Sequence, residues 1–221
     1  MTKPTVRPSE LENEIDEKGY FHRQNNNFIE PFGGKTGNPV EAGRYRLVWA
    51  KGCQWSNRAS IVIELLGLDK AISTVIVGRN KHEQDYGWEF VNGEKNHDEV
   101  LGVQYLSELY YYADPNYKGR STVPALIDIK SKKVVNNDYH WLTNYFERDF
   151  KELQSKDAPD LYPVELRDEI DDFNKFLFDS VNNAVYKAQF AQSLEAYNDA
   201  INTFYESLGI LEERLSDQRY L

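Results

Sequence analysis

Residues 45–66 of the chain read YRLVWAKGCQWSNRASIVIELL, and this stretch decides the fold. The apolar run 45–50 predicts a strand, and apolar residues at helical spacing beyond it predict a helix over 53–67. Cys53 therefore opens a helix directly after a strand. The N-terminus of a helix carries partial positive charge, which favours a thiolate over a thiol. A free cysteine is also commonly a small core residue, so Cys53 is either a reactive thiol or a packing residue.

Cys53 is the only cysteine among the 221 residues, and Ser56 stands at the second position of a Cys-x-x-Cys pair. A lone thiolate has no partner with which to close an intramolecular disulfide. Its redox chemistry would run through a mixed disulfide with a separate thiol such as glutathione. One cysteine also excludes a disulfide scaffold and a structural zinc site, and it fits a reducing cytosol. The four histidines share no metal-ligand spacing, so no metal site is expected.

The composition is that of a globular chain with unevenly spread charge. Hydrophobic residues make up 40% of it, and the net charge of −10 argues against nucleic acid as a partner. Basic residues outnumber acidic ones between Gly43 and Lys81, so a positive field surrounds Cys53 and would attract an anionic ligand. The sequence contains no apolar signal segment and no run long enough to span a membrane. We therefore expect a cytoplasmic protein with no membrane partner.

The first two thirds of the chain mix strands and helices. Strand, helix and strand follow one another from residue 44 to 77, and this βαβ spacing implies parallel pairing. Residues 78–103 are polar and read as a long irregular loop. The remaining elements are a helix at 103–112, a hairpin with strands at 122–128 and 133–135, and a helix at 137–150. The resulting order, β-α-β-α-β-β-α, is that of the thioredoxin fold.

Changes in composition divide the chain into four segments. Residues 1–42 lack periodicity and are expected to form an extended N-terminal arm on the surface, ahead of a thioredoxin-like domain at 43–153. The polar segment 154–163 contains two prolines and reads as a linker. Beyond it, apolar residues at helical spacing predict an all-α C-terminal domain over 164–221, with helices at 164–186 and 193–216.

Several motifs, taken together, resemble one family. Short ones are Arg44-Tyr45-x-Leu47, Cys53-x-Trp55-x-x-Arg58 and Gly87-Trp88-x-Phe90, and longer ones are ADPNYKGRSTVP at 113–124 and VNNAVYKA at 181–188. From about residue 20 onward, the chain resembles the xi-class glutathione transferases. These are omega-like, cysteine-type enzymes that include the glutathionyl-hydroquinone reductases. The resemblance implies a glutathione transferase fold, with an α/β thioredoxin-like domain followed by an all-α domain that is incomplete here.

The resemblance also implies an enzyme with glutathione as its co-substrate. In the family, the cysteine thiolate attacks the sulfur of a glutathionyl-hydroquinone, the hydroquinone leaves, and a second glutathione releases glutathione disulfide. Cys53 is then the nucleophile, and Tyr186 is the catalytic residue on the hydroquinone side. The residues implied to contact glutathione are Trp88, Arg120, Val123, Pro124, Asp138 and Tyr139, with the Val123–Pro124 bond cis. An aromatic conjugate is the expected substrate, and a homodimer the expected assembly.

Three features depart from the family pattern. Gln54 stands where the family usually has proline, and Asp138-Tyr139 stands where it has a Glu-Ser pair for the γ-glutamyl group. Family members also continue beyond the position of Leu221 through helices that shape the hydroquinone pocket. We therefore expect this chain to bind a glutathione-type ligand more readily than to turn over a conjugate, and to self-associate or bind a hydrophobic dye. The alternatives are a non-catalytic glutathione-transferase-like binding module and a truncated pseudo-enzyme.

Overall fold

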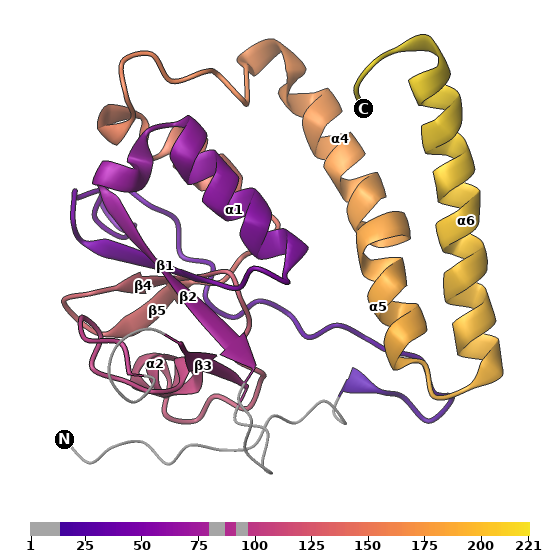
Figure 1. Cartoon of the computed structure of the whole chain (residues 1–221), viewed down its shortest axis with the longest axis horizontal. Coiled ribbons are helices and arrows are strands. Elements are labelled where there is room, and N and C mark those ends of the chain that lie inside the picture. The colour runs from indigo at the N-terminus through magenta and orange to yellow at the C-terminus, as the bar shows by residue number, and fades with distance from the viewer. Residues whose placement is uncertain (1–13, 80–86, 92–96) are drawn as a thin grey trace. The chain divides into compact units, whose positions relative to one another are not determined.

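The computed structural model describes residues 14–79, 87–91 and 97–221, which fall into two compact units (Figure 1). The α/β unit contains residues 25–161 of the described chain. The helical unit contains residues 14–24 together with 162–221. Each unit is described by itself below.

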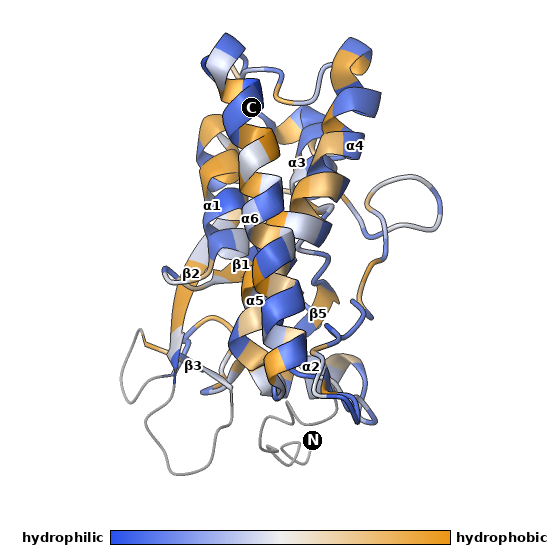
Figure 2. Ribbon diagram, turned by 90° about the vertical axis from the view of Figure 1, so that its right-hand side faces the viewer, coloured by the Kyte–Doolittle hydropathy of each residue, from blue (hydrophilic) through white to orange (hydrophobic). Residues whose placement is uncertain are grey.

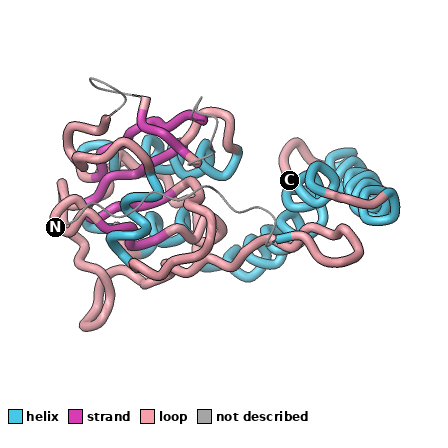
Figure 3. The backbone as a smooth tube through the Cα atoms, turned by 90° about the horizontal axis from the view of Figure 1, so that it is seen from below, coloured by secondary structure: helices cyan, strands magenta, loops and turns pink. Residues whose placement is uncertain are grey.

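A single mixed sheet forms the centre of the α/β unit, with its strands drawn in magenta in Figure 3. Among the described residues its order is β3-β2-β1-β4-β5. β1 pairs in parallel with β2, whereas the β1–β4, β2–β3 and β4–β5 pairs are antiparallel. The strands are β1 (Tyr45–Trp49), β2 (Ile72–Arg79), β3 (Trp88–Phe90), β4 (Ala125–Asp128) and β5 (Lys133–Asn136).

Three helices accompany the sheet: α1 (Gln54–Leu65), α2 (Leu106–Ala113) and α3 (Leu142–Arg148). A parallel pair of strands needs a crossover connection, and α1 supplies it between β1 and β2. α1 buries Trp55, Ser56, Ala59 and Ile63, which repeat at helical spacing and so form one face. α1 packs with α3 over a core that includes Tyr45, Leu47, Phe146 and Phe150. α2 packs against β5 and β3.

The thioredoxin-like order predicted from the sequence is confirmed, with one strand added. β3 lies inside the segment that the sequence predicted to be irregular, where Val77 pairs with Phe90 and Arg79 with Trp88. This strand is only three residues long, which is too short to show an alternating pattern. Residues 80–86 and 92–96, which belong to the same segment, lie outside the described chain. α3 also begins later than predicted, because residues 137–141 form turns ahead of it.

The segment predicted as a surface arm is divided between the two units. Residues 14–24 belong to the helical unit and residues 25–42 to the α/β unit. Phe32 is buried, with its ring centroid 5.0 Å from that of Phe150 and 5.5 Å from that of Tyr45. Part of the predicted arm therefore contributes to the core, because Phe32 in a largely polar stretch finds an apolar site there.

The helical unit consists of α4 (Arg167–Leu177), a π-helical turn η5 (Phe178–Asn182), α5 (Asn183–Phe190) and α6 (Leu194–Asp217). Ser193 caps α6, since its hydroxyl accepts a hydrogen bond from the Ala196 N–H at 3.2 Å. α5 and α6 pack against each other. In Figure 2, α6 carries both hydrophilic and hydrophobic residues along its whole length, as an amphipathic helix does. None of the helices described in either unit has the length and apolar character needed to cross a membrane.

Residues 14–24 form hydrogen bonds with residues at the start of α5, between α5 and α6, and in α6. The Gln192 N–H donates to the Gly19 carbonyl at 2.9 Å, and the Tyr20 hydroxyl donates to Asp199 at 2.7 Å. That second bond raises the pKa of Tyr20 to about 12. Arg23 donates from Nε to Asn183 Oδ1 at 2.8 Å. The segment therefore holds the start of α5 and the start of α6 together.

Candidate functional site

Cys53 occupies the N-cap position of α1. Its backbone is extended (φ −106°, ψ 115°), its N–H donates to the Ala50 carbonyl, and its carbonyl accepts the Asn57 N–H, both at 3.0 Å. The side chain makes no capping bond to the helix. Because the first N–H groups of a helix have no partner within it, the sulfur lies where a helix favours negative charge.

The second element of the site is the segment that enters β4. The Val123–Pro124 peptide bond is cis, as predicted. The Cys53 thiol donates to the Val123 carbonyl with a sulfur–oxygen distance of 3.6 Å. Within the described chain, the Val123 N–H donates to no group. A backbone donor and a backbone acceptor of Val123 therefore lie beside the sulfur.

The third element is the turn before α3, which two residues of α1 hold in place. The Trp55 and Tyr139 ring centroids are 5.0 Å apart. Arg58 donates through one terminal nitrogen to the His140 carbonyl at 2.5 Å and to Thr143 Oγ1 at 3.0 Å. Burial lowers the pKa of Arg58. The helix that begins at Cys53 is thus tied to the segment that carries Asp138 and Tyr139.

Asp138 lies at the start of that turn and is almost fully buried. Its N–H donates to Asn136 Oδ1 at 2.9 Å. Its Oδ1 accepts the Trp141 N–H and the Asn26 side-chain N–H, both at 3.3 Å. Neither Asn26 nor Arg58 was among the candidate site residues chosen from the sequence. Arg58 belonged to the Cys53 motif but had no assigned role, and nothing local to Asn26 indicated its contact with Asp138.

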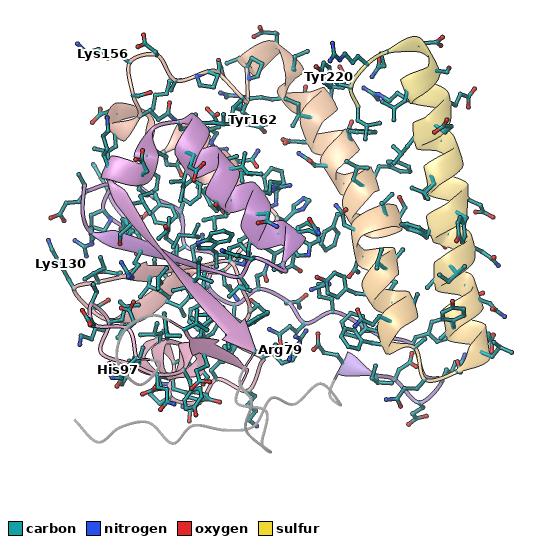
Figure 4. All side chains as sticks on the ribbon, viewed as in Figure 1. Arg79, His97, Lys130, Lys156, Tyr162 and Tyr220 are labelled. Carbon is teal, nitrogen blue, oxygen red and sulfur yellow. The ribbon has the colours of Figure 1, made fainter. Side chains whose placement is uncertain are left out.

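The other candidate residues lie on neighbouring segments. Trp88 is in β3, where the Arg79 guanidinium carbon lies 5.2 Å from its ring centroid; Arg79 ends β2 (Figure 4). The Arg120 carbonyl accepts the Tyr117 hydroxyl at 2.9 Å. Tyr186 is in α5 of the helical unit, with the Arg23 guanidinium 4.3 Å from its ring centroid. The structure thus brings Cys53 together with Val123, and ties its helix to the Asp138 turn.

No group of three or more His, Cys, Asp or Glu side chains in the described residues could hold a metal ion. His82, one of the histidines considered in the sequence, lies outside the described residues. In the helical unit, His22 Nε2 pairs with Asp16 Oδ2 at 2.8 Å.

Comparisons with known proteins identify the family. The glutathionyl-hydroquinone reductase YqjG of Escherichia coli is 39% identical over 190 residues, which cover 85% of this chain and 57% of that protein. The crystal structure of the xi glutathione S-transferase of Phanerochaete chrysosporium is 34% identical with a TM-score of 0.85, covering 96% of this chain and 70% of that one. The chain belongs to the xi-class glutathione transferases.

The chain also resembles a structure that was solved with a bound ligand. The glutathione-bound structure of YqjG from Escherichia coli K-12 is 35% identical with a TM-score of 0.77, over 92% of this chain and 67% of that one. The chain spans between 57% and 65% of the length of the curated relatives that it matches first. Its sequence matches no family model.

Proposed function

We propose that this xi-class transferase is a glutathione-dependent thiol reductase that acts on glutathionyl-hydroquinones or related conjugates through a Cys53–glutathione mixed disulfide. The observation that carries the proposal is the 3.6 Å approach of the Cys53 sulfur to the Val123 carbonyl, at a cis-proline and at a helix N-terminus. An extended thiol peptide that paired with the Val123 backbone would present its own sulfur to Cys53. The family supports glutathione as that peptide.

The first step removes the thiol proton, which in this structure is donated to the Val123 carbonyl. The thiolate then attacks the sulfur of the glutathionyl conjugate. An S–S bond forms and the carbon–sulfur bond breaks, and its electron pair leaves with the aromatic ring, which takes up a proton as the hydroquinone. The helix N-terminus favours the thiolate that this attack requires.

The second step regenerates Cys53. A second glutathione thiolate attacks the glutathione sulfur of the mixed disulfide, and Cys53 leaves as a thiolate together with glutathione disulfide. Over both steps two glutathione sulfurs are oxidised to a disulfide and the carbon–sulfur bond is reduced. The chain has one cysteine, so an external thiol must carry out this step.

The roles of the other residues rest on the resemblance and on the geometry above. Val123 and Pro124 would pair with the cysteinyl backbone of glutathione, and Asp138 and Tyr139 would receive its γ-glutamyl group. Trp88 and Arg120 are assigned to glutathione, and Tyr186 to the aromatic ring, on the resemblance alone. The aromatic conjugate and a homodimer belong to the same proposal on the same grounds.

Incubation with glutathione disulfide followed by intact mass measurement tests the mechanism. We expect one glutathionyl adduct on the wild-type chain, no adduct on Cys53→Ser, and release of the adduct by added glutathione. Absence of the wild-type adduct would overturn the proposal. An adduct that forms without turnover of any glutathionyl-hydroquinone would instead favour the non-catalytic binding module, for which the hydrogen bond of the Cys53 thiol to the Val123 carbonyl is the supporting observation.

A further inference from the structure

Residues 26–30 lie along β5, the edge strand of the sheet, next to the turn that carries Asp138. Ile29 forms an antiparallel bridge with Asn136, and the Asn137 N–H donates to the Phe28 carbonyl at 2.8 Å. The Phe28 N–H donates in return to Asn137 Oδ1 at 3.2 Å. The Asn136 side chain donates to the Glu30 carbonyl at 3.3 Å. Three hydrogen bonds therefore fix this segment relative to Asp138.

Phe28 anchors the same segment by packing. Its ring centroid lies 5.4 Å from that of Tyr110 and 5.4 Å from that of Tyr117. Aromatic pairs at this separation attract one another in addition to burying apolar surface. Two residues before this anchor, the chain places the Asn26 side chain against Asp138.

Asn26 donates from Nδ2 to Asp138 Oδ1 at 3.3 Å. Its own Oδ1 is buried and accepts no hydrogen bond in the described chain. A buried acceptor without a hydrogen-bond donor costs free energy. The favourable contribution of the Asn26 side chain therefore comes from the hydrogen bond that its NH₂ group donates to Asp138. The other oxygen of the carboxylate, Asp138 Oδ2, accepts no hydrogen bond from the described residues. Asn26 thus fixes one oxygen of the carboxylate and leaves the other for a ligand.

We infer that Asn26 is a positioning residue for glutathione selectivity: it orients the Asp138 carboxylate toward the ammonium group of the γ-glutamyl moiety. The inference rests on the proposed function. Asp138 has a shorter side chain than the glutamate usual in the family, so its carboxylate needs its orientation fixed from outside. A charge-assisted bond between an ammonium group and a carboxylate is strong only when its geometry is held.

The test compares two disulfides that differ by the group Asp138 would bind. Glutathione disulfide contains the γ-glutamyl group, and cysteinylglycine disulfide lacks it. With each, the Cys53 thiolate attacks one sulfur, the S–S bond breaks, and the other half leaves as a thiolate. The rate of adduct formation is measured by intact mass for the wild type, Asn26→Ala, Asn26→Asp, Asp138→Asn and Asn26→Ala with Asp138→Asn. Asn27→Ala is the matched control, since Asn27 is the adjacent residue and is exposed.

We expect the wild type to react faster with glutathione disulfide, and Asn26→Ala to lower that preference about tenfold, the lower end of the effect of losing one hydrogen bond to a charged group. Asn26→Asp should lower it further, because two carboxylates would then face each other. The rate with cysteinylglycine disulfide should not change, which separates positioning from a general loss of structure. In the Asp138→Asn background, Asn26→Ala should have no further effect. Asn27→Ala should behave as the wild type.

Three results would overturn the inference. Equal wild-type rates with the two disulfides would remove the γ-glutamyl site at Asp138, while the adduct itself would leave the reductase proposal standing. A wild-type preference that survives in Asn26→Ala would remove the role of Asn26 alone. A wild type that forms no adduct with either disulfide would overturn the proposed function, and the inference with it.

Discussion

The two units of this chain are stabilised in different ways. In the α/β unit a continuous core of fully buried side chains, among them Tyr45, Leu47, Phe146 and Phe150, joins the sheet to α1 and α3. In the helical unit α4 has no buried residue, and α6 buries Ala196, Ala200, Ser207 and Leu211. The described apolar residues with the most exposed side chains, Leu194 and Val164, also belong to the helical unit.

The difference shows which interactions fix the positions of the side chains in each unit. A side chain in the α/β unit is positioned by many neighbours at once, so the Cys53 and Val123 backbones are fixed by the whole core. The helical unit relies more on individual contacts, such as those of residues 14–24, among them the Phe21 ring 5.2 Å from that of Phe190. One substitution should therefore act differently in the two units.

The largest effect is expected from Phe150→Ala. Phe150 is fully buried, and its ring lies 5.0 Å from Phe32 and 5.8 Å from Phe146. Its loss should lower the free energy of unfolding of the α/β unit by about 3–5 kcal/mol. Phe173→Ala in α4 is the control: Phe173 is half-buried and should cost less. Segment-resolved hydrogen exchange measures both, and equal losses would contradict the comparison.

The next effect tests the contacts of residues 14–24. Gly19 has φ +84°, and a Cβ there would lie 2.8 Å from backbone atoms of Gln192 and Ser193. Gly34 has φ +66° with no atom near such a Cβ. Both alanine variants introduce backbone strain of order 1–3 kcal/mol, and only Gly19→Ala adds a clash. We expect faster hydrogen exchange in residues 14–24 and at the start of α6 for Gly19→Ala. Equal effects of the two variants would show that the clash is relieved without cost.

The smallest effect concerns one poorly satisfied group in the α/β unit. Burial raises the pKa of Asp149 above its usual value of 3.8. This outweighs the opposite effect of Arg148, whose terminal nitrogen lies 3.7 Å from Asp149 Oδ1. Its Oδ2 is buried without a hydrogen-bond partner. Because the pKa of Asp149 is higher in the folded than in the unfolded chain, the protonated carboxyl group favours the folded state. This contribution to the free energy of unfolding is fully present below pH 3.8 and is lost as the pH rises through the folded-state pKa. Asp149→Asn should therefore gain stability over the wild type from acid to neutral pH, by less than about 1 kcal/mol at pH 7. A melting-temperature difference independent of pH would contradict this.

The parts of the fold that the sequence predicted correctly are those with local patterns. Apolar spacing indicated β1 and α1, and the position of Cys53 between them followed directly. The string ending in Val123-Pro124 predicted the cis bond through the resemblance. Three-residue β3 was missed because so short a strand has no periodicity of its own.

The contacts that the sequence could not predict join distant residues. The bond between Asn26 and Asp138 spans 112 residues, and the bond between Tyr20 and Asp199 spans 179. Each depends on how the chain returns to a surface formed elsewhere, and no local spacing records that. Hydrogen-bond partners of Arg58 were hidden for the same reason, although the residue itself was part of the motif.

The π-helical turn at Phe178–Asn182 changes the phase of the segment that the sequence presented as one helix. A π turn inserts about one extra residue into the α-helical count, and each residue of an α-helix advances by about 100° around the axis. Side chains after the turn therefore point in a direction rotated by roughly that angle from the one an unbroken helix would give them. At about 100° per residue, an unbroken helix would place Tyr186 roughly 160° around the axis from Ile170, and one inserted residue reduces that angle to roughly 60°. The direction in which the Tyr186 side chain leaves its helix therefore depends on the residue inserted at this turn, as does that of every later side chain in α5.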